Sequence, residues 1–203
     1  MTKRLVNART RWWLRATALP ACALVLCGCI NVLPAPRVGE QSEAKAFGKI
    51  IHDLMPETER QLTQEQTTAR KLRITLDEAG SLSPQDFRDR FNGYIDQLIA
   101  VRAKRRDLRA RLTEKNWTSP MVVNVQANCV RDLDEQIMRD QQWIEWAQGV
   151  RLRGEMGQQK RFPELELLQH ALDNFLALPV TDPLSMQLRA LLDEFGITEA
   201  QLG

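Results

Sequence analysis

Apolar side chains recur every three or four residues along most of the chain, from Ser42 towards the C-terminus. This spacing gathers them on one face of an α-helix, whereas a half-buried β-strand would show strict alternation. No alternating stretch of that kind interrupts the pattern. The sequence therefore predicts an all-α protein in which residues 42–203 form a single helical bundle domain, a length sufficient for one core.

The first predicted helix runs from about Ser42 to Ala79. Gly80 should end it, and Pro56 should kink or break it, because proline removes a backbone donor and clashes with the preceding turn. One side of this helix carries the residues expected to be buried: Ala44, Phe47, Ile51, Leu54, Thr58, Leu62, Glu65, Ala69, Leu72 and Leu76.

The second predicted helix has the most regular pattern. Ser83 is placed to cap it, Pro84 suits its first position, and Asp86 makes the first turn acidic. Its core positions alternate steps of four and three, which is a heptad pattern. These positions are Phe87, Phe91, Tyr94, Leu98, Val101, Arg105, Leu108 and Leu112.

A third long helix is predicted from Pro120 to about Arg153, with Val123, Val130, Ile137 and Ile144 repeating every seven residues. Further apolar residues flank this repeat and widen the expected buried face: Val122, Cys129, Trp143 and Val150 on one side, and Leu133 and Ala147 on the other. Residues 163–175 and 183–195 form two short helices that start with proline and share leucine, aspartate and phenylalanine at the same offsets. They are either an internal duplication or two independent amphipathic helices. We expect three long antiparallel helices in a coiled-coil-like bundle plus these two short C-terminal helices.

The stretch 102–111 of the second helix is strongly basic. It could bind lipid headgroups or an acidic partner, or it could be a solvated face balanced by neighbouring acids. Arg105 is different, because it occupies a core position. It either pairs with a core-facing carboxylate such as Glu65 or Asp140 and fixes the register, or marks a place where the bundle opens to a partner. The candidate partner-binding residues are Arg102, Arg105, Arg106 and Arg109.

Other candidate chemistry has a simpler structural interpretation. Residues 75–86 partly resemble an EF-hand calcium loop, but a helix end at Gly80 and a cap at Ser83 account for the same residues. Trp143 and Trp146 could line a ligand groove, although aromatic residues at helical spacing usually belong to a core. His52 and His170 have no metal-ligand neighbour one turn away. With no catalytic motif recognised, we predict no enzyme activity, no cofactor and no metal site.

The first 28 residues have a different composition. Five basic residues and no acid occupy positions 1–15, and an apolar run from Ala16 to Leu26 follows. A basic segment, a short apolar run and then small residues form the order of a secretory signal peptide. A membrane-spanning helix would need about twenty apolar residues, so an uncleaved anchor is the weaker alternative.

This apolar run ends in Leu26-Cys27-Gly28-Cys29, which resembles the lipobox of bacterial lipoproteins: an aliphatic residue, a variable one, Gly or Ala, and then the lipid-bearing Cys. The resemblance implies cleavage after Gly28, with Cys29 carrying diacylglycerol on its sulfur and a fatty acyl group such as palmitate on its amino group. An ordinary signal peptide cleaved elsewhere is the alternative.

Residues 29–41 are predicted to form an extended tether, because Pro34, Pro36 and Gly39 disfavour a helix. By resemblance to lipoprotein sorting, Ile30 in place of the Asp that retains lipoproteins at the inner membrane implies the outer membrane, with the domain facing the periplasm. The inner membrane is the alternative location.

Loss of the signal peptide changes both the charge and the cysteine count. The full chain has 28 basic and 26 acidic residues, and the signal carries five of the basic ones, which leaves a net charge of −3. That charge gives no argument for a nucleic-acid partner. Of the four cysteines, Cys22 and Cys27 would leave and Cys29 would carry lipid. Cys129 then has no disulfide partner and is predicted to be a small buried apolar residue.

Taken together, these features predict a lipid-anchored periplasmic helical lipoprotein. Its membrane contact is the N-terminal lipid, and its expected role is that of a non-catalytic envelope adaptor or assembly factor that binds an envelope protein. The alternative is a small-molecule or lipid-binding module, with a pocket between the bundle and the C-terminal helices near Trp143 and Trp146.

Overall fold

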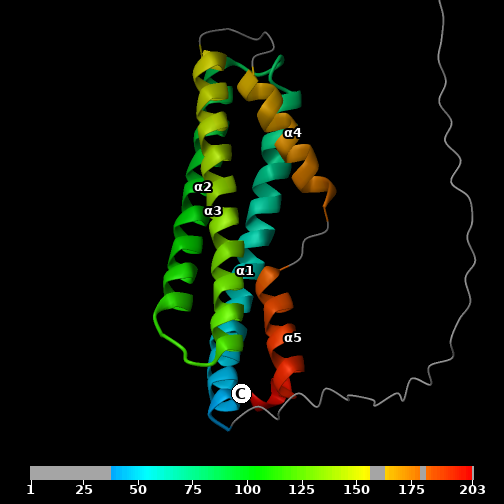
Figure 1. The fold of residues 1–203 in the computed structure, drawn as a ribbon. Coiled ribbons are helices and arrows are strands. Elements are labelled where there is room, and N and C mark those ends of the chain that lie inside the picture. Colours follow the sequence, from blue (N-terminus) through cyan, green and yellow to red (C-terminus); the bar gives the residue numbers. More distant parts are fainter. Residues whose placement is uncertain (1–37, 156–162, 179–181, 203) are drawn as a thin grey trace, which may run out of the picture. The chain divides into compact units, whose positions relative to one another are not determined.

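A computed structural model describes residues 38–155, 163–178 and 182–202 (Figure 1). The predicted signal peptide, the lipobox with Cys29, and most of the predicted tether lie outside these residues. The described part of the chain is all α-helical, with no β-strand, as the sequence predicts. Its helices are α1 (Val38–Asp77), α2 (Pro84–Thr113), α3 (Pro120–Glu155), α4 (Pro163–Ala177) and α5 (Pro183–Phe195), followed by one short 3₁₀ turn, η1 (Glu199–Gln201).

The helix boundaries follow from local capping chemistry. The Ser83 hydroxyl accepts a hydrogen bond from the backbone N–H of Asp86 at 3.1 Å, and Pro84 opens α2 as predicted. Asp182 caps α5 in the same way, through the N–H of Leu184 at 3.1 Å. Gly196 ends α5 at φ 60, in the left-handed region that glycine adopts without strain.

The start of α3 is held by a side chain from a distant part of the chain. The carboxylate of Glu43 on α1 accepts hydrogen bonds from the backbone N–H groups of Thr118 at 2.9 Å and Ser119 at 2.8 Å, and from the Thr118 hydroxyl at 2.5 Å. These bonds, that of the hydroxyl foremost, hold the pKa of Glu43 below its ordinary value. This contact joins the first turns of α1 to the α2–α3 connection.

Two details of α1 refine the prediction. The helix begins at Val38, so residues 38–41, which the sequence assigned to the tether, are helical. Gln41 contacts the end of α5 through a side-chain hydrogen bond to the Phe195 carbonyl at 3.4 Å, which favours order there. Of the kink or break expected at Pro56, the break does not occur, since the helix continues through the proline. Buried residues on both sides of the proline hold it against the rest of the bundle.

The short helices occupy successive parts of one surface. Both α4 and α5 pack against α1 and α3, while α2 packs between α1 and α3 on the other side. Along α1 and α3, α4 lies beside one half and α5 beside the other, as Figure 1 shows. The matched leucines of the two sequences have the same role, since Leu168 and Leu172 of α4 and Leu188 and Leu192 of α5 are all buried.

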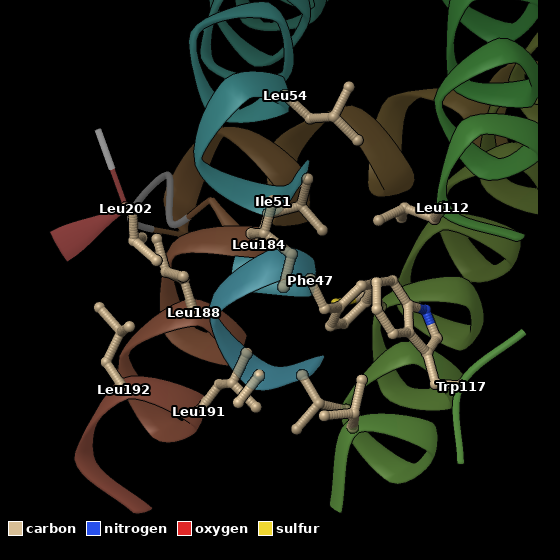
Figure 2. Close-up of a cluster of buried hydrophobic side chains, with 14 of the residues drawn as sticks. Phe47, Ile51, Leu54, Leu112, Trp117, Leu184, Leu188, Leu191, Leu192 and Leu202 are labelled. Atoms are coloured by element: carbon tan, nitrogen blue, oxygen red, sulfur yellow. The ribbon is translucent and has the colours of Figure 1, made fainter. Parts of the chain in front are cut away.

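The buried apolar residues form two separate clusters rather than one. The α5 cluster contains Phe47, Ile51, Leu112 and the leucines of α5, and Trp117 packs on Phe47 with ring centroids 5.4 Å apart (Figure 2). The α4 cluster contains Leu72, Phe91, Trp143 and the leucines of α4. α1, α2 and α3 contribute to both clusters, so each of these helices spans the whole domain.

All ten positions predicted to be buried on α1 are buried, and so are those on α2 except the half-buried Tyr94. The predicted face of α3 is wrong in detail. Val123 is 43% exposed, and Val130 and Ile137 are only half-buried. The fourth heptad position, Ile144, is buried as predicted, and so are the six flanking residues: Val122, Cys129, Trp143, Val150, Leu133 and Ala147. Val125 and Asp140 are buried as well.

Candidate functional site

A buried cluster of charged residues lies among the long helices. Arg105 of α2 is 1% exposed, and Glu65 of α1 and Asp140 of α3 are fully buried. We call these three residues the ion cluster. None of them belongs to either apolar cluster. This is the core arginine for which the sequence offered two interpretations.

The geometry of the ion cluster decides between them. One terminal nitrogen of Arg105 donates to both carboxylate oxygens of Asp140, at 2.5 and 2.6 Å. Its other terminal nitrogen donates to Glu65. Arg105 therefore pairs with both predicted carboxylates and connects α1, α2 and α3, which confirms the predicted pairing. A cation shared in this way is expected to restrict the register of the three helices. An enclosed side chain cannot also be a surface contact.

Arg139, which the sequence analysis did not single out, completes the arrangement. Its guanidinium donates to the second carboxylate oxygen of Glu65 at 2.8 Å, and its side chain is 32% exposed. It also lies 5.0 Å from the ring centroid of Phe175 and 5.7 Å from that of Trp143. Two arginines thus neutralise two buried acids. The only sequence signal for Arg139 is its place next to Asp140.

The electrostatics reflect the low polarity of the surroundings. Burial raises the pKa of Asp140 to about 6, because the attraction of Arg105 only partly opposes the loss of water and the nearby Glu65 adds to the rise. Burial alone would lower the pKa of Arg105, but attraction by Glu65 and Asp140 outweighs it and raises that pKa. The guanidinium therefore stays charged and shared between two carboxylates.

Other buried polar side chains also connect the helices. Thr68 donates to the Gln97 side chain at 2.9 Å and so joins α1 to α2. Thr58 donates to Asp182 at 3.1 Å and joins α1 to the cap of α5. Burial raises the pKa of Asp182. Each of these two hydrogen bonds connects two helices, so together with the ion cluster they help to set how the helices align.

The other candidate arginines lie on the surface of α2. Arg106 is exposed and Arg102 is half-exposed. Arg109 donates to Asp134 of α3 at 2.6 Å, with both side chains about four-tenths exposed. The structure thus separates the four predicted partner-binding residues into one interior residue, Arg105, and three that remain candidates for an interface.

Trp143, Trp146 and Phe175 pack in or against the α4 cluster. Trp143 is 2% exposed and meets the ring of Phe175 edge-on with centroids 5.0 Å apart. Trp146 packs at the margin of the α4 cluster. One surface pocket lies between α1 and Gln97 of α2, and another lies where α5 begins beside Arg139. Neither pocket is lined by Trp143 or Trp146.

The remaining candidates have structural roles. Cys129 is fully buried, and burial raises the pKa of its thiol to about 12, as expected for an inert core cysteine. Asp77, within the EF-hand-like segment, pairs with Arg73. Within the described ranges, no group of three metal-ligating side chains converges. None of the helices in these ranges is long and apolar enough to cross a bilayer.

Comparison of the chain with protein-family models, with curated proteins and with solved structures finds no match.

Proposed function

We propose that this chain is a lipid-anchored envelope lipoprotein whose helical domain acts as a non-catalytic adaptor or assembly factor. The observation that carries the proposal is the sequence Leu26-Cys27-Gly28-Cys29 at the end of a signal-like segment. In this proposal Cys29 holds the protein at the periplasmic face of the outer membrane, and residues 30–37 separate the lipid from α1.

The interior of the domain supports a structural rather than a catalytic role for its buried charges. Glu65 and Asp140 are both bound by arginines from other helices. A general acid or base must exchange its proton with a substrate, whereas these acids face guanidinium groups inside the bundle. We further propose that α2 and its neighbours cross as in a coiled coil, which the heptad spacing of α2 supports.

The lipid anchor is tested by Cys29→Ala in full-length protein. We expect this variant to lose labelling by a palmitate analogue and to accumulate as an uncleaved precursor, while Cys27→Ala keeps both labelling and cleavage. Membrane fractionation of the two variants gives the location. Undiminished labelling of Cys29→Ala would contradict the anchor.

The adaptor role is tested with photo-reactive residues introduced at exposed positions of the anchored protein. Positions 102, 106, 167 and 186 sample different faces of α2, α4 and α5. We expect one face to give a discrete crosslinked protein in intact cells, and crosslinking to stop when the anchor is removed. Tryptophan fluorescence that responds saturably to one metabolite or lipid, with no discrete crosslink, would favour a binding module instead.

A further inference from the structure

The interior of the bundle uses the seven-residue repeat of α3 only in part. Val123 is 43% exposed, and Val130 and Ile137 are half-buried. The next residue of the series, Ile144, is 3% exposed and belongs to the α4 cluster. Residues spaced by seven lie on one side of a helix, so α3 carries an apolar stripe of about two heptads at the margin of the core, where Val130 also packs against the α5 cluster.

This stripe runs beside a row of α2 residues. The pair Arg109–Asp134 joins α2 to α3, and the carbonyl of Leu112 accepts from Gln126 at 2.7 Å, so the two helices are antiparallel there. Ile99, Arg102 and Arg106 lie on the same side of α2 as Arg109, in steps of three and four, and Val130 and Ile137 lie one turn either side of Asp134. We call this surface the outer seam: Ile99, Arg102, Arg106, Val123, Val130 and Ile137.

The outer seam is both apolar and basic. Ile99 is 39% exposed, which adds to the α3 stripe from the opposite side. Among the described residues, no ion pair involves Arg102 or Arg106, and the acid that lies between the two rows, Asp134, is already bound by Arg109. In Figure 1, α4 and α5 lie beside α3 and α1, on the side of α3 that faces away from α2.

We propose that the outer seam docks an acidic amphipathic helix of a partner protein. This inference rests on the proposed adaptor function and names the chemistry of the partner. From Val123 to Ile137 the stripe is roughly 21 Å long at 1.5 Å per residue, which matches three to four turns of a second helix. Apolar residues at heptad spacing would meet the stripe, and glutamates beside them would pair with Arg102 and Arg106.

A second copy of this chain fits the outer seam less well than an acidic helix. A two-fold dimer places the same surface of each copy face to face. When the two-fold axis runs across the helices, Arg102 and Arg106 meet the arginines of the other copy, which is unfavourable unless acids intervene. When it runs along them, the arginines face the apolar stripe of the other copy, which offers them no acid apart from Asp134, already bound by Arg109. Charge complementarity therefore favours a partner with acidic flanks.

The test uses full-length protein in detergent micelles and two synthetic helical peptides of about four heptads, each with leucine at the core positions. One peptide carries glutamate at the flanking positions and the other carries lysine. We expect the glutamate peptide to bind about tenfold more tightly by fluorescence anisotropy. The double variant Arg102→Glu/Arg106→Glu should reverse this preference, and Lys104→Glu, on a different side of α2, should not.

The apolar part of the surface is tested separately. Ile137→Asp and the more exposed Val123→Asp should each weaken binding of the glutamate peptide about tenfold, while Met186→Asp on α5, whose methionine is 60% exposed, should leave it unchanged. Circular dichroism identifies variants that keep the helical fold. Equal binding of both peptides, or binding insensitive to both seam aspartates, would overturn the proposal.

Two other outcomes would assign the seam to a different occupant and equally overturn the proposal. Self-association that is lost in Val123→Asp, measured by analytical ultracentrifugation, would indicate a second copy. Binding to anionic phosphatidylglycerol vesicles that is lost in the double arginine variant and kept in Val123→Asp would indicate a lipid surface. Discrete crosslinks formed only from positions on α4 or α5 would show that the partner does not dock on the outer seam, but they would still support the adaptor function.

Discussion

Arg105 holds three helices together because each of its terminal nitrogens meets an acid from another helix. Removing two acids and an arginine from water is costly, and the attraction within the cluster offsets that cost only while all partners are present. Glu65 and Asp140 are fully buried, so neither can turn to solvent if the arginine is lost. The cluster therefore contributes more to alignment than to net stability.

Arg105→Met should lower the free energy of unfolding by about 3–5 kcal/mol, because it leaves two buried carboxylates without their shared cation. Urea denaturation gives the value. Arg111→Met, which removes an arginine that is 46% exposed and pairs with Glu57, should cost less than about 1 kcal/mol. The triple variant Glu65→Leu/Arg105→Met/Asp140→Leu should recover most of the loss. A cost below about 1 kcal/mol for Arg105→Met would contradict the structural role.

Asp140 also predicts how stability varies with pH. The pKa of Asp140 is about 6 in the folded protein, against an ordinary value of 3.8 for an aspartate side chain in water. Between about pH 6 and about pH 4, therefore, the folded state holds this proton more tightly than the unfolded state does. This group therefore stabilises the protein as the pH falls from about 6 to about 4, and the gain is lost as the pH rises again. Burial also raises the pKa of Asp182, so this group likewise stabilises the protein as the pH falls. The pKa of Glu43 is lowered, so its contribution to stability is lost as the pH falls.

The contribution of Asp140 is isolated by measuring the melting temperatures of wild type and Asp140→Asn at each pH and taking the difference. The melting temperature of wild type relative to Asp140→Asn should rise on acidification through this range. A difference that stays constant from pH 7 to pH 4 would show that Asp140 titrates as an ordinary carboxyl group.

At the scale of the elements, the sequence predicted α2 best and α3 least well. On α2 residue type marks the capping residues and every core position but one, where Tyr94 was expected and Ile95 is buried. Even the partners of Arg105 could be named, because an arginine at a core position requires an acid at a facing one. On α3 the flanks of the heptad are buried as predicted, but the buried side also passes through Asp140. Hydrophobicity alone therefore overestimates the burial of Val123, Val130 and Ile137. Arg139 was missed for a related reason, because nothing in a sequence distinguishes a surface arginine from one that reaches a buried acid.

Close packing of α2 against α3 depends on one small residue. A methyl group on Gly154 would lie 2.9 Å from Cδ1 of Phe87 and still closer to Cε1, whereas one on Gly93 of α2 would meet nothing within 4 Å. Phe87 is buried, so its ring has little room to move. Gly154→Ala should therefore destabilise the protein by about 1–3 kcal/mol.

Gly93→Ala is the matched control for that substitution. It adds the same methyl group to a helix without a clash, and it should stabilise the protein by up to about 1 kcal/mol through helix propensity. Urea midpoints of the two variants, at equal slopes, measure the comparison. Equal effects of the two alanines would show that α2 and α3 are less closely packed at Gly154 than the structure indicates.

At the scale of the whole domain, two apolar clusters share three continuous helices. α5 contributes to one cluster and α4 to the other, but α1, α2 and α3 pass through both. A helix that loses its packing in one cluster also loses the alignment that the ion cluster imposes on the other. We therefore expect the two clusters to unfold together, in one cooperative transition.

The tryptophans report on the two clusters separately. Trp117 lies in the α5 cluster, and Trp143 with Trp146 lies in the α4 cluster. Urea transitions followed in a Trp143→Phe/Trp146→Phe variant and in a Trp117→Phe variant should each coincide with the helical signal of the same protein. Leu188→Ala in α5 should shift both cluster signals by the same amount, at a cost of about 2–5 kcal/mol. If Leu188→Ala lowered the midpoint of the Trp117 signal alone, the clusters would be independent folding units and the ion cluster would not couple them.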